Sequence, residues 1–159
     1  MKRPIKKILV RRSSSRLGAV QALYQMEVAG TPLPDVLAQF EAFWLGRTVE
    51  GETYKFADAE YFRAIVSGVL KDQYALDQAI DEALSDGWPL KRIEALLRAV
   101  LRAGDYELSH CPDVPGAVVI NEYVDVAAAF FGEEECRMVS GVLNALARKR
   151  RTGEFGAAG

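Results

Sequence analysis

The sequence predicts an all-α fold: a compact bundle of about six to seven helices in two small subbundles. Apolar residues recur at helical spacing in successive blocks, and Gly and Pro residues fall in clumps between those blocks. No stretch shows the sustained apolar–polar alternation of a half-buried strand. The 159 residues are enough for one domain with a real core.

The first helix is expected to follow the serines at residues 13–15, whose hydroxyls can cap a helix start. Gly30 and Pro32 would end it, because Gly is favoured just past a helix and Pro cannot continue one. A second helical block covers residues 36–44. Residues 46–57 are polar and are expected to form a loop.

Asp58 is placed to cap the next helix, whose apolar side lies within residues 61–70. A separate helix over residues 76–84 would end near Gly87-Trp88-Pro89. Residues 93–101 carry the fullest apolar stripe, which is typical of a helix buried among others.

The C-terminal third is expected to contain a rigid turn followed by two helices. The turn lies at residues 112–116 and is interpreted as a break between the two subbundles. Helices are expected over residues 118–131 and after Gly132, where the acids at residues 133–135 would oppose the positive end of the helix dipole.

Charge is segregated along the chain, although the net charge is only −2. Residues 1–16 hold seven cations and no acid, residues 17–147 hold 9 Lys and Arg against 21 Asp and Glu, and Arg148 begins a run of four cations. Clustered like charges repel one another unless a polyanion lies against them. The pattern favours a nucleic-acid partner, with an anionic membrane surface or a solubility role left open.

Other features exclude broad classes of protein. No apolar run approaches the roughly 18 residues that span a bilayer, and the apolar segment at residues 8–10 is too short for a signal peptide. A cytoplasmic location without membrane contact is therefore expected. Cys111 and Cys136 lack metal-binding spacing and the chain has one His, which favours two reduced thiols.

Catalytic chemistry is not indicated, because the common nucleotide-binding, hydrolase and zinc-protease motifs are missing. His110 stands alone near a helix end, where a capping or surface role is expected. Asp77 and Asp81 are interpreted as part of a solvated helix face, and residues 133–135 as a helix-start cluster in preference to a metal site. We expect neither enzyme activity nor a cofactor.

Binding surfaces are the remaining candidates for function. Lys and Arg neutralise phosphates, and aromatic rings stack on unpaired bases. Tyr74, close to Lys71 and Gln73, is a candidate stacking residue, with a tyrosine that covers core as the alternative. Arg98 and Arg102 are expected to pair with acids along a helix rim, or alternatively to contact phosphate.

Four segments, at residues 16–24, 61–69, 101–108 and 114–143, carry motifs in a fixed order. They are similar to R-x-x-A-V-Q-A-L-Y after a basic leader, F-x-x-x-L-x-x-G-V, L-R-x-A-x-Y-E-L, and V-P-x-x-V-x-I-N-E … F-G … V-N-G-V-L. In these segments the chain resembles the NusB transcription antitermination family, over roughly residues 11–147. Any one motif is weak, but four in register are specific.

The resemblance implies a NusB-like fold that binds the boxA element of ribosomal RNA transcripts together with the small ribosomal protein NusE. This assembly joins RNA polymerase and suppresses premature termination, without a cofactor. The RNA-binding positions that it implies are Lys2, Arg3, Lys6, Lys7, Arg11, Arg12, Arg16, Lys71, Gln73 and Tyr74. The partner-protein face that it implies is formed by Tyr24, Glu134, Glu135 and Met138.

The sequence departs from the family pattern near that partner face. Met138 stands where the family usually has Phe, Ser140 replaces Asn, and Ala128 replaces a common Lys. A shorter turn after Gly132 leaves open which glutamate contacts the partner.

The expected organisation is a flexible basic arm at residues 1–12, a single helical RNA-binding domain at 13–150 and a disordered tail at 151–159. Two alternatives stay open. One is a NusB-like interaction module or homodimer without sequence-specific RNA binding. The other is a detached, non-catalytic relative of the module fused to ribosomal RNA cytosine methyltransferases.

Overall fold

The computed structural model describes residues 5–44, 47–49, 52–54, 58–84 and 89–155, with side chains for residues 12–42, 58–84 and 89–155. Within these ranges the chain forms seven α helices, one short 3-10 helix and one hairpin. None of these helices has the length and apolar character needed to cross a membrane. The predicted all-helical class is confirmed.

The chain divides into two compact units, Met1–Ser67 and Gly68–Gly159. The boundary lies within α3 (Ala59–Ala83), whose first turns belong to the first unit and whose remaining turns belong to the second. The expectation that the turn at residues 112–116 separates two subbundles is wrong, because the helices on both sides of that turn pack together in the second unit.

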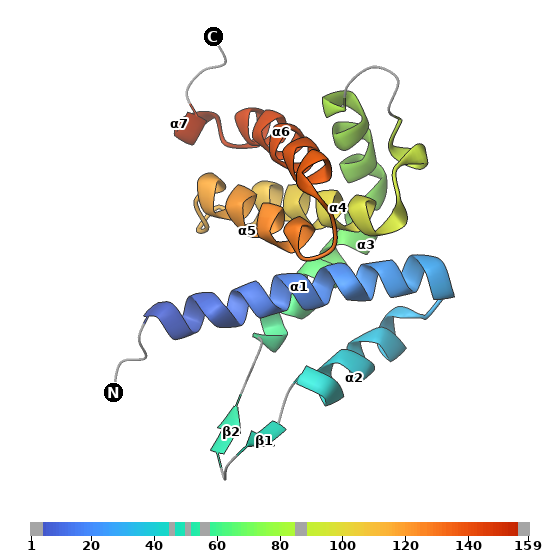
Figure 1. The fold of residues 1–159 in the computed structure, drawn as a ribbon, viewed down its shortest axis with the longest axis vertical. Coiled ribbons are helices and arrows are strands. Elements are labelled where there is room, and N and C mark those ends of the chain that lie inside the picture. The colour runs from blue at the N-terminus through green and yellow to red at the C-terminus, as the bar shows by residue number, and fades with distance from the viewer. Residues whose placement is uncertain (1–4, 45–46, 50–51, 55–57, 85–88, 156–159) are drawn as a thin grey trace. The chain divides into compact units, whose positions relative to one another are not determined.

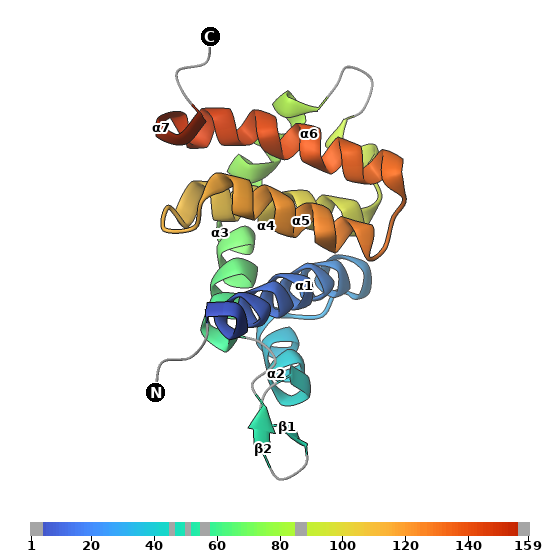
Figure 2. The ribbon, with the colours of Figure 1, turned by 60° about the vertical axis from the view of Figure 1, so that its left-hand side comes forward.

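In the first unit, α1 (Ile5–Ala29) and α2 (Leu33–Trp44) lie side by side and are joined by a tight turn (Figures 1 and 2). Gly30 follows α1 with φ 69°, and its N–H donates to the Met26 carbonyl at 3.1 Å. Glycine adopts this left-handed conformation at little cost. The predicted helix end at Gly30 is confirmed.

The start of α1 differs from the expectation. The helix begins at Ile5, so that residues 5–12, expected to belong to a flexible arm, are helical, and the serines at 13–15 lie inside the helix and do not cap it. No proline interrupts residues 5–29, and the helix can therefore continue through the serines. Ser15 instead bonds to α3: its hydroxyl donates to the Asp58 carbonyl at 2.7 Å and accepts from the Asp58 N–H at 2.8 Å.

A short hairpin lies between α2 and α3, where a loop was expected. The strand β1 (Arg47–Val49) pairs antiparallel with β2 (Glu52–Tyr54), with Thr48 opposite Thr53. The strands are rich in Thr, Val and Tyr, which favour extended backbone. Three residues per strand are too few for alternation to be recognised in a sequence.

The helix α3 is continuous, although the sequence suggested two helices. Asp58 Oδ1 accepts from the Tyr61 N–H at 3.1 Å, which confirms the predicted N-cap. Neither Gly nor Pro breaks the polar stretch at residues 71–75, and the helix runs through it. Its buried apolar residues recur at helical spacing: Phe62, Ile65, Val66, Val69, Leu76 and Ile80.

In the second unit, α4 (Ala95–His110), α5 (Gly116–Ala128) and α6 (Glu133–Arg150) pack side by side (Figures 1 and 2). The 3-10 helix η1 (Leu90–Arg92) precedes them, and α7 (Thr152–Phe155) follows in the segment expected to be a disordered tail. Acids fill the first turn of α6 as predicted. The core of these helices includes Leu97, Val100, Leu101, Leu108, Val119, Tyr123, Val139, Leu143 and Leu146.

Two glycines allow close packing in the second unit. A Cβ on Gly68 would lie 2.0 Å from Cε1 of Tyr106, and a Cβ on Gly104 would lie 2.8 Å from Cδ2 of Leu143. Both distances are shorter than real carbon contacts. Glycine at these positions therefore lets α4 approach α3 and α6 closely.

Candidate nucleic-acid interface

The first half of α1 carries most of the predicted RNA-binding cations. Five of the seven lie in this helix: Lys6, Lys7, Arg11, Arg12 and Arg16. Lys2 and Arg3 lie outside the described residues. Among the five, side chains are described for Arg12 and Arg16 alone. The cations thus follow a helix in place of the expected flexible arm.

Arg12 and Arg16 both approach the ring of Tyr61 at the start of α3. The guanidinium carbon of Arg12 lies 4.6 Å from the ring centroid, and that of Arg16 lies 5.4 Å from it. Arg16 Nη2 also donates to the Tyr61 hydroxyl at 3.5 Å. A cation over an aromatic face is attracted by the ring's quadrupole. Both arginines of α1 are therefore in contact with the first turn of α3.

Burial separates the two arginines. Arg16 is only 1% exposed, whereas Arg12 is half-buried. A guanidinium that is buried in the protein cannot at the same time neutralise a phosphate in solution. The placement of Arg16 therefore favours a structural role in this state, and its predicted RNA contact stays a prediction.

A second group of predicted RNA-binding residues lies on the part of α3 that belongs to the second unit. Tyr74 is 78% exposed, Lys71 is exposed and Gln73 is half-buried. The amide of Gln78, one turn later, donates to the Tyr74 hydroxyl at 3.0 Å. The alternative that Tyr74 covers core is wrong, because most of its side chain is exposed. An exposed ring beside a lysine is suited to stacking on a base.

The predicted partner-protein residues are divided between the two units. Tyr24 is 36% exposed on α1, and Val28, one turn later on the same helix, is 60% exposed. Glu134 is exposed and Glu135 and Met138 are half-buried in the first turns of α6. Exposed apolar side chains at consecutive turns suit a protein contact.

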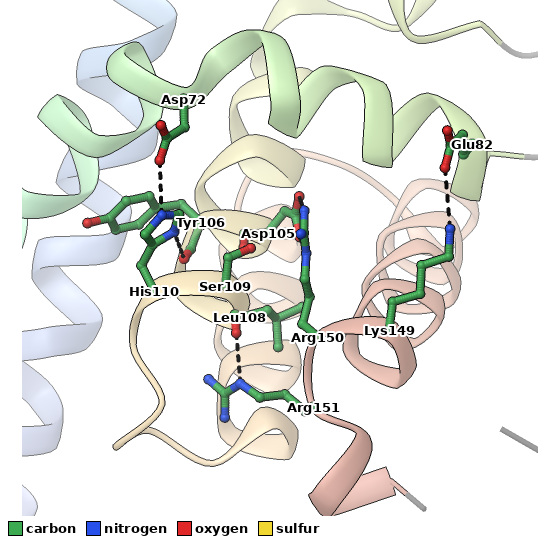
Figure 3. A network of polar contacts seen from close by, with 10 residues as sticks. All are labelled: Asp72, Glu82, Asp105, Tyr106, Leu108, Ser109, His110, Lys149, Arg150 and Arg151. Atoms are coloured by element: carbon green, nitrogen blue, oxygen red, sulfur yellow. Dashed lines mark hydrogen bonds and ion pairs between the residues drawn. The ribbon is translucent and has the colours of Figure 1, made fainter. Parts of the chain in front are cut away.

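The C-terminal basic run, residues 148–151, makes ion pairs and hydrogen bonds within the second unit (Figure 3). Lys149 Nζ lies 3.4 Å from Glu82 Oε2 on α3. Arg150 forms a bidentate pair with Asp105 on α4, with N–O distances of 3.1 and 3.0 Å. Burial raises the pKa of the Asp105 carboxyl above its ordinary value of 3.8, and the pair with Arg150 opposes that rise.

Arg151, at the end of this run, is buried. Its guanidinium donates to the main-chain oxygens of Leu108, Val114, Cys111 and Glu107 at 2.7, 2.8, 2.9 and 3.3 Å. It also donates to Glu154 Oε2 at 2.5 Å, and Glu154 Oε1 accepts from the Gly116 N–H at 2.8 Å. Carbonyls at a helix C-terminus lack partners within their own helix. The clustering of these four cations does not by itself indicate a polyanion, because three of them bond within the fold.

His110 has the surface position that was predicted. Its side chain is 43% exposed, its ring stacks on Tyr106 with centroids 4.7 Å apart, and its Nε2 lies 3.0 Å from Asp72 Oδ2 (Figure 3). These contacts connect α4 to α3. They account for His110 without an acid–base role.

Several other charged residues of α3 and α4 pair with each other or with main chain. Arg102 forms a bidentate pair with Asp77, at 2.7 and 2.9 Å, which confirms that it pairs with an acid, although the acid is Asp77 of α3 and not Glu94 as expected. Arg98 donates to main-chain oxygens of the preceding turn. Asp81 Oδ1 accepts from the Leu90 N–H at 2.9 Å. Asp77 and Asp81 lie on the surface of α3, as interpreted, and each also bonds to a neighbouring segment of the second unit.

Two residues of the candidate interface were missed by the sequence analysis. Gln78 lies four residues after Tyr74, and this spacing brings side chains together on a helix, so the pair could have been found. Tyr61 was counted only as part of an apolar helix face. Its contact with two arginines joins residues 45 or more positions apart, and no local pattern marks it.

The fold and these surfaces define a small helical protein with a cationic helix and an exposed aromatic residue. Among the described residues no group of His, Cys, Asp and Glu could hold a metal ion. A model of the NusB family matches residues 13–148. The chain belongs to the NusB family.

Relatives and solved structures agree with this family. The transcription antitermination protein NusB of Bradyrhizobium diazoefficiens is 62% identical, over 92% of this chain and 88% of that protein. The protein of the same name from Nitrobacter hamburgensis is 60% identical, over 91% of each. The T. maritima NusB structure has a TM-score of 0.73 and 27% identity, and covers 98% of this chain and 99% of that one.

A further solved structure has the same fold at lower identity. It contains the antitermination factors NusB and NusE in complex with double-stranded RNA. Its TM-score is 0.72 at 20% identity, over 86% of this chain and 96% of that one.

Proposed function

We propose that this chain is a transcription antitermination factor that binds boxA RNA of ribosomal RNA transcripts together with NusE and helps RNA polymerase resist termination. The observation that carries the proposal is the family match over residues 13–148, with relatives named transcription antitermination proteins at about 60% identity. The role is that of an adaptor without a cofactor, not of an enzyme. It implies the cytoplasmic location expected from the sequence.

RNA binding is supported by two surfaces, one in each unit. The cations on α1 supply the electrostatic attraction to phosphates, which carries no sequence information by itself. Tyr74 supplies an exposed ring for a base, next to the exposed Lys71. We assign Lys2, Arg3, Lys6, Lys7, Arg11 and Arg12 to phosphate contact, and Lys71, Gln73 and Tyr74 to the RNA strand.

Partner binding is assigned to Tyr24 on α1 and to Glu134, Glu135 and Met138 on α6. The support is their exposure at helix surfaces and the NusB–NusE–RNA structure with which this chain shares its fold. Met138 and Ser140 differ from the usual family residues. We therefore expect the contacts at this end of α6 to differ in detail from those of other members.

The direct test is binding of a labelled boxA RNA and a scrambled RNA of equal length, each with and without NusE, at several salt concentrations. We expect tighter binding of boxA and an affinity that falls as salt rises. Equal binding of both RNAs would contradict sequence-specific recognition and favour a helical interaction module or homodimer. An affinity that does not depend on salt would contradict the phosphate role of α1.

A pair of variants tests whether Tyr74 stacks on a base. Tyr74→Leu removes the ring and should weaken boxA binding about tenfold, since stacking on one base is worth about 1–3 kcal/mol. Tyr74→Phe keeps the ring and should bind almost as the wild type. If Tyr74→Leu binds boxA RNA as tightly as the wild type, Tyr74 does not stack on a base of the RNA.

A further inference from the structure

One aromatic ring in the first unit contacts two guanidinium groups from consecutive turns of α1. Tyr61 lies 4.6 Å from Arg12 and 5.4 Å from Arg16, measured from its ring centroid, and its hydroxyl accepts from Arg16. One turn before Tyr61, the main chain of Asp58 makes two hydrogen bonds with Ser15. The start of α3 therefore holds residues 12–16 of α1.

Residues 12–16 of α1, which Tyr61 and Asp58 hold, need contacts from outside the helix to be helical. Residues 1–16 contain seven cations and no acid, and the first acid of the chain is Glu27. Like charges four residues apart, such as Arg12 and Arg16, destabilise a helix. The first residues of a helix are also its least stable part, because the first turn gains few hydrogen bonds. A polar contact from another helix can offset both effects.

We propose that Tyr61 is a positioning residue for RNA binding, whose ring holds Arg12 and Arg16 and so keeps the cationic first turns of α1 helical before RNA arrives. The proposal rests on the proposed function, because it takes Lys6, Lys7, Arg11 and Arg12 of α1 to be phosphate contacts. Arg16 then acts through Tyr61 and not by touching RNA. This role explains why a cation of the basic leader is buried.

The functional consequence is a lower cost of ordering on binding. A flexible cationic arm loses conformational freedom when it settles on a phosphate backbone, and that loss reduces affinity. A helix that is already formed presents the same cations at fixed spacing. RNA affinity should therefore depend on Tyr61, although Tyr61 lies at the start of a different helix.

The first experiment measures hydrogen exchange in the free full-length protein. In a helix that begins at Ile5, the amides from residue 9 onward have a helical acceptor. We expect protection of residues 9–16 in the wild type, loss of it in Tyr61→Leu, and its retention in Tyr61→Phe, which keeps the ring. Phe40→Leu is the matched control, because Phe40 stacks on Phe62 in the same unit, 5.5 Å away between centroids.

The second experiment measures boxA RNA affinity and NusE affinity of the same variants. We expect Tyr61→Leu to bind RNA about tenfold more weakly, in the range of one lost cation–π contact with a partly desolvated arginine. Tyr61→Phe and Phe40→Leu should stay within about twofold of the wild type. NusE affinity should not change in any variant, whereas a general loss of structure would lower both affinities.

Three results would overturn the proposal: no protection of residues 9–12 in the wild type, equal protection in wild type and Tyr61→Leu, or equal impairment of Tyr61→Leu and Tyr61→Phe. If Tyr61→Leu does not fold, Tyr61→Met replaces it as the variant that lacks a ring. The exchange measurement needs no RNA. A wild type with protected residues 9–16 that does not bind boxA would contradict the proposed function and leave the holding of α1 by Tyr61 intact.

Discussion

Arg151 provides hydrogen bonds to four main-chain oxygens at the end of α4 and in the turn that follows it. In the sequence it is the last of four consecutive cations, and nothing local distinguishes it from Arg148. The difference arises from position on α6: Arg148 is exposed, whereas Arg151 lies just past the helix end and turns inward. Its partner Glu154 also bonds to the first residue of α5.

We expect Arg151→Ala to lower the free energy of unfolding by about 3 kcal/mol, because it leaves several buried carbonyls without a donor. Urea unfolding of the whole protein, monitored by circular dichroism, measures this change in free energy. Arg148→Ala, three residues earlier in the same run, is the control and should stay within about 0.5 kcal/mol of the wild type. Equal effects of the two substitutions would mean that the hydrogen bonds of Arg151 do not stabilise the fold.

Because of Asp105, we expect the stability of the fold to depend on pH. Burial raises its pKa in the folded state above 3.8, in spite of the pair with Arg150. The folded state then holds the proton more tightly than the unfolded state. The contribution of Asp105 to the free energy of unfolding is therefore fully present below the pKa of the unfolded state. It is lost as pH rises through the pKa of the folded state.

The corresponding measurement compares wild type and Asp105→Asn by urea unfolding between about pH 3.5 and pH 7, a range that begins just below the ordinary Asp pKa. The stability of the wild type relative to the variant should fall as pH rises above 3.8. Titrations of all other groups are common to both proteins and cancel in the difference. A difference that grows with pH would show that the ion pair with Arg150 outweighs burial.

At the scale of elements, the sequence predicted the helical type and several helix ends and starts, but not the start of α1. Gly30 and Asp58 act locally, through backbone conformation and a side-chain cap, and both were predicted correctly. The serines at residues 13–15 have the same local chemistry as a cap, yet α1 begins at Ile5. Ser15 bonds to Asp58, 43 positions away, and such a contact is not visible in a sequence.

Close packing between helices gives a prediction at this scale. Gly68→Ala places a Cβ 2.0 Å from the Tyr106 ring and should lower the free energy of unfolding by about 1–3 kcal/mol, as overpacking usually does. Thermal and urea unfolding both measure this change.

Gly141→Ala is the matched control, because Gly141 lies within α6 and a Cβ there would meet nothing within 4 Å. Alanine at that position should raise the free energy of unfolding by about 0.5–1 kcal/mol through its higher helix propensity. A neutral Gly68→Ala would mean that α3 and α4 can separate at no cost.

At the scale of the whole molecule, the class of fold and the family follow from the sequence, because apolar periodicity and four ordered motifs extend over most of the chain. The candidate site follows only in part. Tyr74 and Lys71 are exposed as an RNA contact requires, whereas Arg16 is buried and Tyr61 was not recognised. Burial of a cation depends on which distant side chain covers it, and composition does not record that.

The two basic clusters at the ends of the chain have different roles in the structure. Two basic clusters in an acidic chain favoured a nucleic-acid partner, but the sequence did not show which cluster would bind it. In the structure the C-terminal cluster bonds mainly to α3, α4 and the turn after α4, while the cations of the N-terminal cluster follow α1. The phosphate contacts are therefore assigned to the N-terminal cluster alone. Replacing Lys6, Lys7 and Arg11 with neutral residues should make RNA binding less dependent on salt, because fewer phosphates are then neutralised. The substitution Arg148→Gln should leave the salt dependence unchanged.

The central claim, that this chain acts in antitermination through boxA RNA, is tested most directly by transcription. A template with a terminator downstream of boxA is transcribed in a cell extract depleted of its own NusB, with and without this protein, and read-through is measured. We expect added protein to increase read-through when boxA is intact and to have no effect when boxA is scrambled. Equal read-through from both templates, or none from either, would contradict the account.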